Sequence, residues 1–283
     1  MTCTRKATAQ MTTSHPLGIA PLSDLSSAPD EFIRIAHDIG FDFVGLRVVP
    51  VTDTEPQYDL SLGSPLHTRV KRALEETGMR VLDAEFLLLD GSDQRASWLQ
   101  AMERASSFGA NTLTVAVADQ NTSRVIDSVS QMVEDGKAFG VVPAIEPISY
   151  QAVCSLPAAV GIAKASGSYV LPDTLHVSRF SGSPTELREA VDAGLVPMLQ
   201  LSDCADLPNT DRATLLWESR SKRGLPGLGS GNVAGLLRAV PRTLPISVEL
   251  PDEERASELG TREWLRLLFA TATEFLHNIE QEG

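Results

Sequence analysis

VVPAIEP, at residues 141–147, is a mostly apolar run that ends on an acid, and three later runs repeat this pattern. They are SYVLPDTLH (168–176), PMLQLSD (197–203) and PISVELPD (245–252). The polar residues at corresponding places are Glu146, Asp173, Gln200 and Glu249. Because helix-like segments separate the runs, we predict successive parallel strands whose carboxyl ends meet at one mouth of a barrel. Three carboxylates and an amide there would supply the oxygen ligands that hard divalent ions prefer.

The alternation of a short apolar run with an amphipathic segment occurs about eight times along the chain. Most of the predicted helices stop at a glycine just before the next apolar run. We therefore predict an α/β fold, a (β/α)8 TIM barrel that forms a single domain over residues 15–283, with residues 1–14 as a disordered extension. The segment 205–231 is predicted to be a long loop. An open, doubly wound sheet is the alternative, but no GxGxxG motif follows the first apolar run.

Charge and composition exclude several classes of partner. The net charge is −13, with 37 acidic and 24 basic residues, which disfavours nucleic acid because that ligand requires a basic surface. No apolar run approaches the roughly 18 residues that span a bilayer. The three cysteines form no CxxC pair. These features predict a cytoplasmic protein. The apolar residues of the segment 261–281 are predicted to pack on the barrel or on a second subunit, which leaves a homodimer open.

Arginines near the predicted mouth bear on the substrate. Arg47 ends the run FDFVGLRVVP, and Arg220 and Arg223 precede the turn PGLG at residues 226–229. A planar guanidinium matches a carboxylate or a phosphate, so these residues favour a small anionic substrate. Glu85, at the end of a third run in DAEFLLL, is expected to reach a substrate hydroxyl or to lie at the rim.

Five motifs in a fixed order resemble the xylose-isomerase-like TIM-barrel superfamily, which contains sugar isomerases, epimerases and dehydratases such as the 3-dehydroshikimate dehydratases. They are AIEP at Glu146, DxxH from Asp173 to His176, QxxD from Gln200 to Asp203, PGLG at 226–229 and VEL at Glu249. The resemblance implies that Glu146, Asp173, Gln200 and Glu249 hold one divalent metal ion. It also implies that Arg223 or Arg220 contacts the substrate. His176 is expected to contact the substrate or to support the metal ligands, and Asp203 to orient a ligand or to bridge to water.

The chain departs from the family pattern at two of these places. Gln200 stands where relatives usually have a histidine, and its neutral oxygen favours Mn or Mg, with Co or Zn as the alternatives. Leu228 stands where relatives have an acidic residue.

The resemblance implies proton abstraction next to a metal-bound carbonyl, with Glu146 and Glu249 as base and acid. An isomerase or epimerase of a small polyhydroxylated keto substrate is the first expectation. A dehydratase (lyase) of a cyclic keto-acid such as 3-dehydroshikimate is the second. A catalytically inactive ligand-binding barrel is the third, and the missing histidine is the argument for it.

Overall fold

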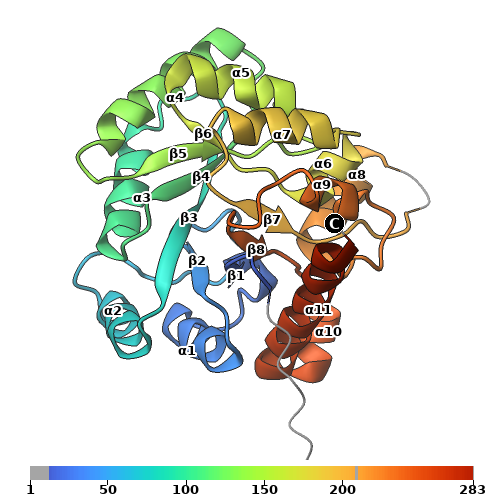
Figure 1. Cartoon of the computed structure of the whole chain (residues 1–283). Helices are drawn as coiled ribbons and strands as arrows, with labels where there is room; N and C mark the ends of the chain where they lie inside the picture. The colour runs from blue at the N-terminus through green and yellow to red at the C-terminus, as the bar shows by residue number, and fades with distance from the viewer. Residues whose placement is uncertain (1–12, 208–209, 283) are drawn as a thin grey trace, which may run out of the picture.

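The computed structural model describes residues 13–207 and 210–282. Within them, eight parallel strands form one curled sheet with helices between successive strands (Figure 1). The strands are β1 (Leu17–Ile19), β2 (Phe43–Arg47), β3 (Arg80–Leu89), β4 (Thr112–Val117), β5 (Val142–Ile145), β6 (Tyr169–Val170), β7 (Leu199–Leu201) and β8 (Ile246–Val248). The structure therefore confirms the (β/α)8 TIM barrel and the single domain.

The helices on the outside of the sheet correspond to the amphipathic segments of the sequence. They are α1 (Pro29–Ile39), α2 (Pro65–Thr77), α3 (Arg95–Ser107), α4 (Thr122–Gly136), α5 (Leu156–Ser166), α7 (Pro184–Asp192), α9 (Val233–Leu237) and α11 (Thr261–Glu282). Helix α1 shows why they end where they do, because Gly40 follows it with a φ of 115°, a left-handed conformation that glycine adopts without strain.

Four further elements lie in segments where no helix was predicted. They are η1 (Pro21–Ser23), α6 (Thr174–Arg179), α8 (Arg212–Ser221) and α10 (Glu253–Leu259). The prediction of a long loop over 205–231 is wrong where α8 lies. Asp211 caps this helix by accepting a hydrogen bond from the Thr214 amide, and its central residues are good helix formers.

The barrel closes between β6 and β7 through a short seam. A single bridge joins Asp173 to Gln200, with the Gln200 amide donating to the Pro172 carbonyl at 2.9 Å. Beside it, the Thr174 hydroxyl donates to the Ser202 carbonyl at 2.6 Å and accepts from the Ser202 amide at 3.0 Å. Two of the predicted site residues are therefore part of the backbone closure of the barrel.

The strands alternate between an apolar outer face and a mixed inner face. Their outward side chains join the helices in the main core, while Phe43, Ala144, Leu171 and Met198 form a separate small cluster. Gly18 allows this inner packing, because a Cβ there would lie 2.2–2.5 Å from the Phe43 ring. Between outward residues, Thr114, Gln200 and Ser247 point inward and give the barrel interior a polar lining.

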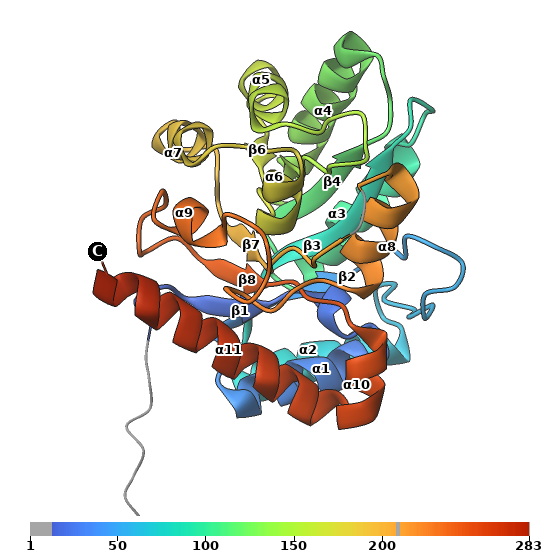
Figure 2. The same ribbon diagram turned by 90° about the vertical axis from the view of Figure 1, so that its right-hand side faces the viewer.

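Helix α11 packs on its own barrel and lies along the length of the molecule (Figure 2). Trp264 is fully buried, and its indole Nε1 donates to the Ser23 carbonyl at 2.9 Å. Thr13 and Ser14, at the end of the predicted extension, bond to Glu280 of this helix. The rest of that prediction, over residues 1–12, lies outside the described residues. None of the helices in the described ranges combines the length and apolar character needed to cross a membrane.

Helix α7 begins with a capping box that offers a test of local stability. The Ser183 hydroxyl accepts from the Glu186 amide, and the Glu186 carboxylate accepts from the Ser183 amide. Replacing Ser183 with Ala should lower the free energy of unfolding by about 1 kcal/mol, because one amide loses its partner. Urea denaturation would measure this, and Ser183→Thr, which keeps the hydroxyl, should recover most of the loss. Equal stability of the Ala and Thr variants would contradict the assignment.

Candidate active site

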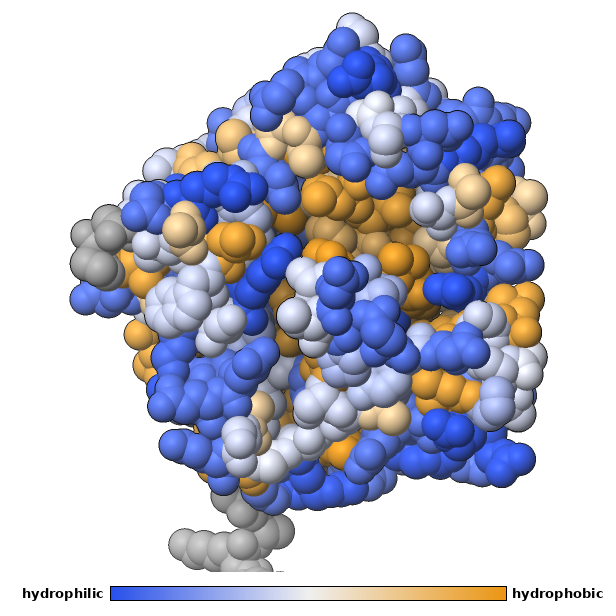
Figure 3. Space-filling view, turned by 180° about the vertical axis from the view of Figure 1, so that it is seen from behind, coloured by the Kyte–Doolittle hydropathy of each residue, from blue (hydrophilic) through white to orange (hydrophobic). Residues whose placement is uncertain are grey.

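The carboxyl ends of the strands open into a cavity of about 710 Å³. Figure 2 shows α8, α10 and the segment after β2 on the same side of the molecule, and the surface seen in Figure 3 is hollowed, with apolar residues between hydrophilic ones. Seven of the nine predicted site residues line the cavity: Arg47, Glu85, Glu146, His176, Arg220, Arg223 and Glu249. Asp173 and Gln200 are not among its lining residues and are buried beside them.

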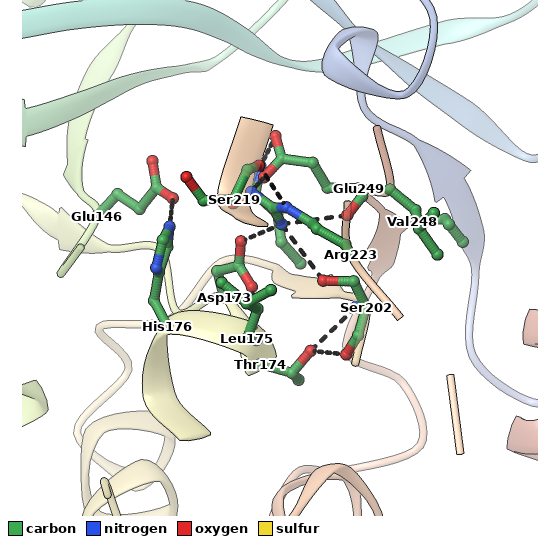
Figure 4. A network of polar contacts seen from close by, with 12 residues as sticks. Glu146, Asp173, Thr174, Leu175, His176, Ser202, Ser219, Arg223, Val248 and Glu249 are labelled. Carbon is green, nitrogen blue, oxygen red and sulfur yellow. Dashed lines mark hydrogen bonds and ion pairs between the residues drawn. The ribbon is translucent and has the colours of Figure 1, made fainter. Parts of the chain in front are cut away.

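Glu146 and His176 lie together on one side of the cavity (Figure 4). His176 Nε2 is 3.9 Å from a Glu146 carboxylate oxygen, and its Nδ1 is 3.2 Å from the Ser149 hydroxyl. Burial, with Glu249 and Asp173 nearby, raises the pKa of Glu146 well above its usual value. Burial also lowers the pKa of His176 to about 4, so its imidazole is neutral at pH 7.

Arg223 lies between two of the expected metal ligands. One guanidinium nitrogen donates to Asp173 at 2.5 Å, and the other pairs with Glu249 at 2.9 Å. Burial alone would raise the pKa of Asp173, but the nearby Arg223 and His176 bring it below its ordinary value. Asp173 is therefore ionised and forms a buried ion pair with the guanidinium.

Gln200 joins the other side of Glu249. Its amide nitrogen donates to Glu249 Oε1 at 3.0 Å and lies 3.4 Å from Glu85. Within the described ranges, its amide oxygen has no hydrogen-bond partner. Burial raises the pKa of Glu249 to about 8, with Arg223 acting in the opposite direction. Gln200 thus presents its nitrogen to the carboxyl groups around it.

A second buried acid lies two residues before Glu85 on β3. Asp83 is 1% exposed, and neither of its carboxylate oxygens has a hydrogen-bond partner in the described part of the chain. Burial, reinforced by Glu249, raises the pKa of Asp83 to about 7, and burial raises that of Glu85 to about 8. The sequence analysis missed Asp83, although its spacing from Glu85 in DAEF is that of residues on one strand face.

Asp83 makes the stability of the protein depend on pH. Its pKa is about 7 in the folded protein against an ordinary value of 3.8, so between these values the folded state holds a proton that the unfolded chain has released. The free energy of unfolding therefore falls as pH rises through this window. At pH 8 the Asp83→Asn variant should be more stable than the wild type by about 2 kcal/mol, since the shift is shared with Glu85.

Urea denaturation at pH 5 and pH 8 measures this effect. Asp53→Asn, at an exposed position, is the control and should follow the wild type at both values. Parallel loss of stability in the wild type and in Asp83→Asn between pH 5 and pH 8 would contradict the assignment.

The other two arginines lie nearer the opening of the cavity. Arg47 lies over the Phe86 ring with its side chain 9% exposed, and its ion pairs are long, 3.5 Å to Glu85 and 3.9 Å to Glu55. Its Nε has no hydrogen-bond partner among the described residues. Arg220 lies on α8 and is half-buried. Arg47 is thus a desolvated cation with free donor capacity at the cavity wall.

Asp203 takes a structural place behind the site. Its carboxylate accepts hydrogen bonds from four backbone amides, those of Cys204, Gly227, Gly229 and Gly231. These contacts hold the turn around Pro226, where Leu228 is exposed in place of the family's acid. Asp203 therefore orients the segment that follows Arg223.

The cavity also contains Tyr150 and Ser219, which the sequence analysis did not single out. Tyr150 lies edge-on to the His176 ring at 5.7 Å, and its hydroxyl is 2.9 Å from that of Ser219. Tyr150 comes four residues after Glu146 in the loop beyond β5, so the position of this aromatic residue after a strand end was the available signal. Ser219 lies on α8, which was not predicted.

The donor atoms fit one divalent ion on the Glu146 side of the site. Glu146, Asp173 and His176 each offer one ligand atom, and the three atoms lie within 4.8 Å of one another. Ligand atoms bound at about 2 Å lie no more than about 4 Å apart, so a small movement of these side chains would bring the two oxygens and the nitrogen onto a single ion. The structure brings Glu146 and Asp173 of the predicted set together there, and Arg223 lies between Asp173 and Glu249 (Figure 4).

Several solved structures resemble the fold. A xylose isomerase-like TIM barrel/4-hydroxyphenylpyruvate dioxygenase fusion protein is 20% identical with a TM-score of 0.73, and the match covers 95% of this chain but only 44% of that protein. The IolI protein with a bound zinc atom is 16% identical with a TM-score of 0.76, covering 93% and 99% of the two chains. The 3-keto-D-glucoside 4-epimerase of E. coli is 15% identical with a TM-score of 0.66, covering 90% and 99%.

No curated protein matches the sequence. The family model of the xylose isomerase-like TIM barrel matches residues 33–270, which include all nine predicted site residues. This match confirms the family that the motifs around Glu146, Asp173 and Glu249 indicated. The chain belongs to the xylose isomerase-like TIM barrel family.

Proposed function

We propose that this protein is an isomerase or epimerase that moves a proton next to the carbonyl of a small, anionic, polyhydroxylated substrate. The observation that carries the proposal is the pair of Glu146 and Glu249, which follow β5 and β8 and line one cavity, both buried and both with raised pKa. Carboxyl groups whose pKa is raised toward neutrality suit general acid–base catalysis near pH 7.

The charge around these two acids favours an anion. Glu85 and Glu249, with pKa values of about 8, are largely neutral at pH 7, whereas the guanidinium groups of Arg47, Arg220 and Arg223 are charged. The part of the cavity around Glu85 and Glu249 therefore carries less negative charge than the sequence suggests, although Asp24, Glu55, Asp252 and Glu253 also line the cavity. Arg47, with its free Nε, is the group that we assign to a substrate carboxylate or phosphate.

In this mechanism Glu146 removes a proton from the carbon beside the carbonyl and Glu249 returns one, or the reverse. Return to the opposite face of the same carbon gives an epimer, and return to the neighbouring carbon gives an aldose–ketose isomer. Arg223 lies beside Glu249 and stabilises negative charge that develops on the substrate oxygen. Tyr150 and His176 pack beside Glu146 and limit the access of water to it.

Glu146 and Asp173 would hold a divalent ion, which would polarise the substrate carbonyl and make the adjacent proton more acidic. We propose that the protein uses this ion, with Mn among the metals to be tried first. We also propose that it acts in the cytoplasm. The epimerase named among the similar structures shares the fold, which accords with the proposal.

A dehydratase of a cyclic keto-acid is the second candidate, and Arg47 is the observation that favours it. A desolvated guanidinium with a free donor at the cavity wall suits the carboxylate of such an acid. The neutral carboxyl of Glu85 or Glu249 could then protonate a leaving hydroxyl, so that water is expelled after the carbon proton is removed.

Proton NMR in D2O tests both candidates. Keto-sugars, their phosphates and acids, and 3-dehydroshikimate would be incubated with the protein, with and without Mn²⁺. An isomerase or epimerase should exchange one carbon-bound proton for deuterium and keep every hydroxyl, whereas a dehydratase should produce new alkenic signals. A folded, Mn-loaded protein that exchanges no proton of any of these substrates would overturn the proposal.

A further inference from the structure

We propose that a divalent ion binds this chain through Glu146, Asp173 and His176, displaced from the site that the sequence predicts. The guanidinium of Arg223 occupies the other side of that predicted site, where Gln200 and Glu249 were expected to be ligands. The inference rests on the metal site of the proposed function and gives it a different ligand set. It also reassigns His176, which the family resemblance treats as a residue that contacts the substrate or supports the metal ligands.

Arg223 is held too firmly to leave that side of the site to a metal. Its Nε donates to the Ser219 carbonyl at 2.8 Å, and one terminal nitrogen donates to the Glu249 carbonyl at 3.1 Å as well as to Asp173. The other terminal nitrogen pairs with the Glu249 carboxylate, and the residue is 4% exposed. A divalent ion between Asp173 and Glu249 would meet this buried positive charge at close range.

Glu249 and Gln200 direct their hydrogen bonds at groups other than an ion, although the Gln200 amide oxygen has no partner among the described residues. One Glu249 oxygen accepts from Arg223, and the other accepts from the Gln200 amide nitrogen. Gln200 directs that nitrogen toward both Glu249 and Glu85, so a donor faces the position where a metal would need an oxygen. In this arrangement Gln200 on β7 turns a hydrogen-bond donor, and not a ligand atom, toward Glu249 and Glu85.

His176 offers an imidazole nitrogen in place of the histidine that relatives usually have at the position of Gln200 on β7. It follows Asp173 by three residues on α6, so both side chains lie on one face of that short helix. Its Nδ1 lies 3.2 Å from the Ser149 hydroxyl and 3.5 Å from the Ser149 amide, which donates to it. When a metal binds, Nδ1 would carry the ring proton and donate it to the hydroxyl, which leaves Nε2 for the ion on the Glu146 side. Metal-binding histidines are commonly oriented by such a partner on the second nitrogen.

The resulting site differs chemically from the one that the sequence predicts. Asp173 retains coordination capacity, because a carboxylate has about four lone-pair sites and its hydrogen bonds with Arg223 and the Leu175 amide use two. Glu146 and His176 both line the cavity, so the open positions of the ion would face the substrate. One imidazole with two carboxylates favours Zn or Co over Mg.

Mn²⁺ serves as the probe because its binding and its ligands can both be followed by electron paramagnetic resonance. Chelator-treated protein would be titrated with Mn²⁺, and pulsed measurements on the bound ion would detect nitrogen coupled to it. The wild type should bind one ion with an imidazole nitrogen signal. His176→Gln should lose that signal and bind at least tenfold more weakly, whereas Gln200→Leu should keep both the signal and the affinity within about threefold.

His67→Gln is the matched control, because His67 is also buried but is bonded to Ser107 and does not line the cavity. Three results would each overturn the inference. The folded wild type binds no Mn²⁺, or it binds Mn²⁺ without nitrogen coupling, or the affinity for Mn²⁺ is lost in Gln200→Leu but kept in His176→Gln. If His176→Gln does not fold, the wild-type spectrum decides alone. Proton exchange in D2O is read separately, so nitrogen-coupled Mn²⁺ without exchange would refute the proposed function and leave this inference intact.

Discussion

Replacing Arg223 with Gln is expected to lower the free energy of unfolding by about 3–5 kcal/mol, the usual cost of removing one partner of a buried charge pair. The variant would leave the Asp173 carboxylate buried without its cation, and Glu249 would lose a donor. It would also leave the carbonyl of Ser219 without the donor that Arg223 Nε supplies. The loss should therefore exceed that of an ordinary surface substitution several times over.

Urea denaturation followed by circular dichroism would measure this loss. Arg220→Gln, the same change three residues earlier in the half-buried Arg220, is the matched control and should cost less than about 0.5 kcal/mol. Similar midpoints for the two variants would show that the ion pair of Arg223 with Asp173 does not stabilise the folded protein.

The second large effect concerns catalysis. Glu146→Gln and Glu249→Gln should each lower the rate of substrate proton exchange by about 10²–10⁴-fold, because an amide can neither accept nor return the proton. Their combined effect should be smaller than the product of the two, since the residues act on one transition state. Both variants should remain folded, because each change replaces a buried carboxyl of raised pKa with a neutral group of the same shape.

Glu253→Gln provides the control for these variants. Glu253 lines the same cavity but is exposed. The rate of substrate proton exchange by the Glu253→Gln variant should therefore stay within about threefold of the wild-type rate. A Glu146→Gln or Glu249→Gln protein that exchanges substrate protons as fast as Glu253→Gln would remove that glutamate from the proposed mechanism.

The barrel and most of the residues at its mouth could be predicted because both follow from the order of apolar and polar residues within short segments. Glu146 and Glu249 end apolar runs, and in a parallel barrel that position alone directs a side chain to the shared mouth. The glycine stops and amphipathic segments marked the helices for the same reason. The position of Arg223 could not be predicted in this way. It depends on α8, a helix in a polar segment that was predicted to be a loop, and on contacts with Asp173 and Glu249, which are distant in the chain.

Arg220 and Arg223, which the sequence analysis left as alternatives, also differ through contacts that are distant in the chain. Arg220 and Arg223 are three residues apart, yet Arg223 is buried among acids from β6 and β8 and Arg220 lies at the rim. The long-range contacts of Arg223 with Asp173 and Glu249 hold its side chain inward. Asp83 shows the opposite case, since its spacing from Glu85 was visible in the sequence.

The seam between β6 and β7 has a consequence for how this protein could evolve. Those strands share one bridge, Asp173 to Gln200, and Arg223 links the same Asp173 to β8 through Glu249. A mutation that remodels the site to accept a new substrate would therefore also loosen the closure of the barrel. Descendants with altered specificity should first acquire stabilising substitutions elsewhere, or change the distant cavity wall around Arg47 and leave the seam residues as they are.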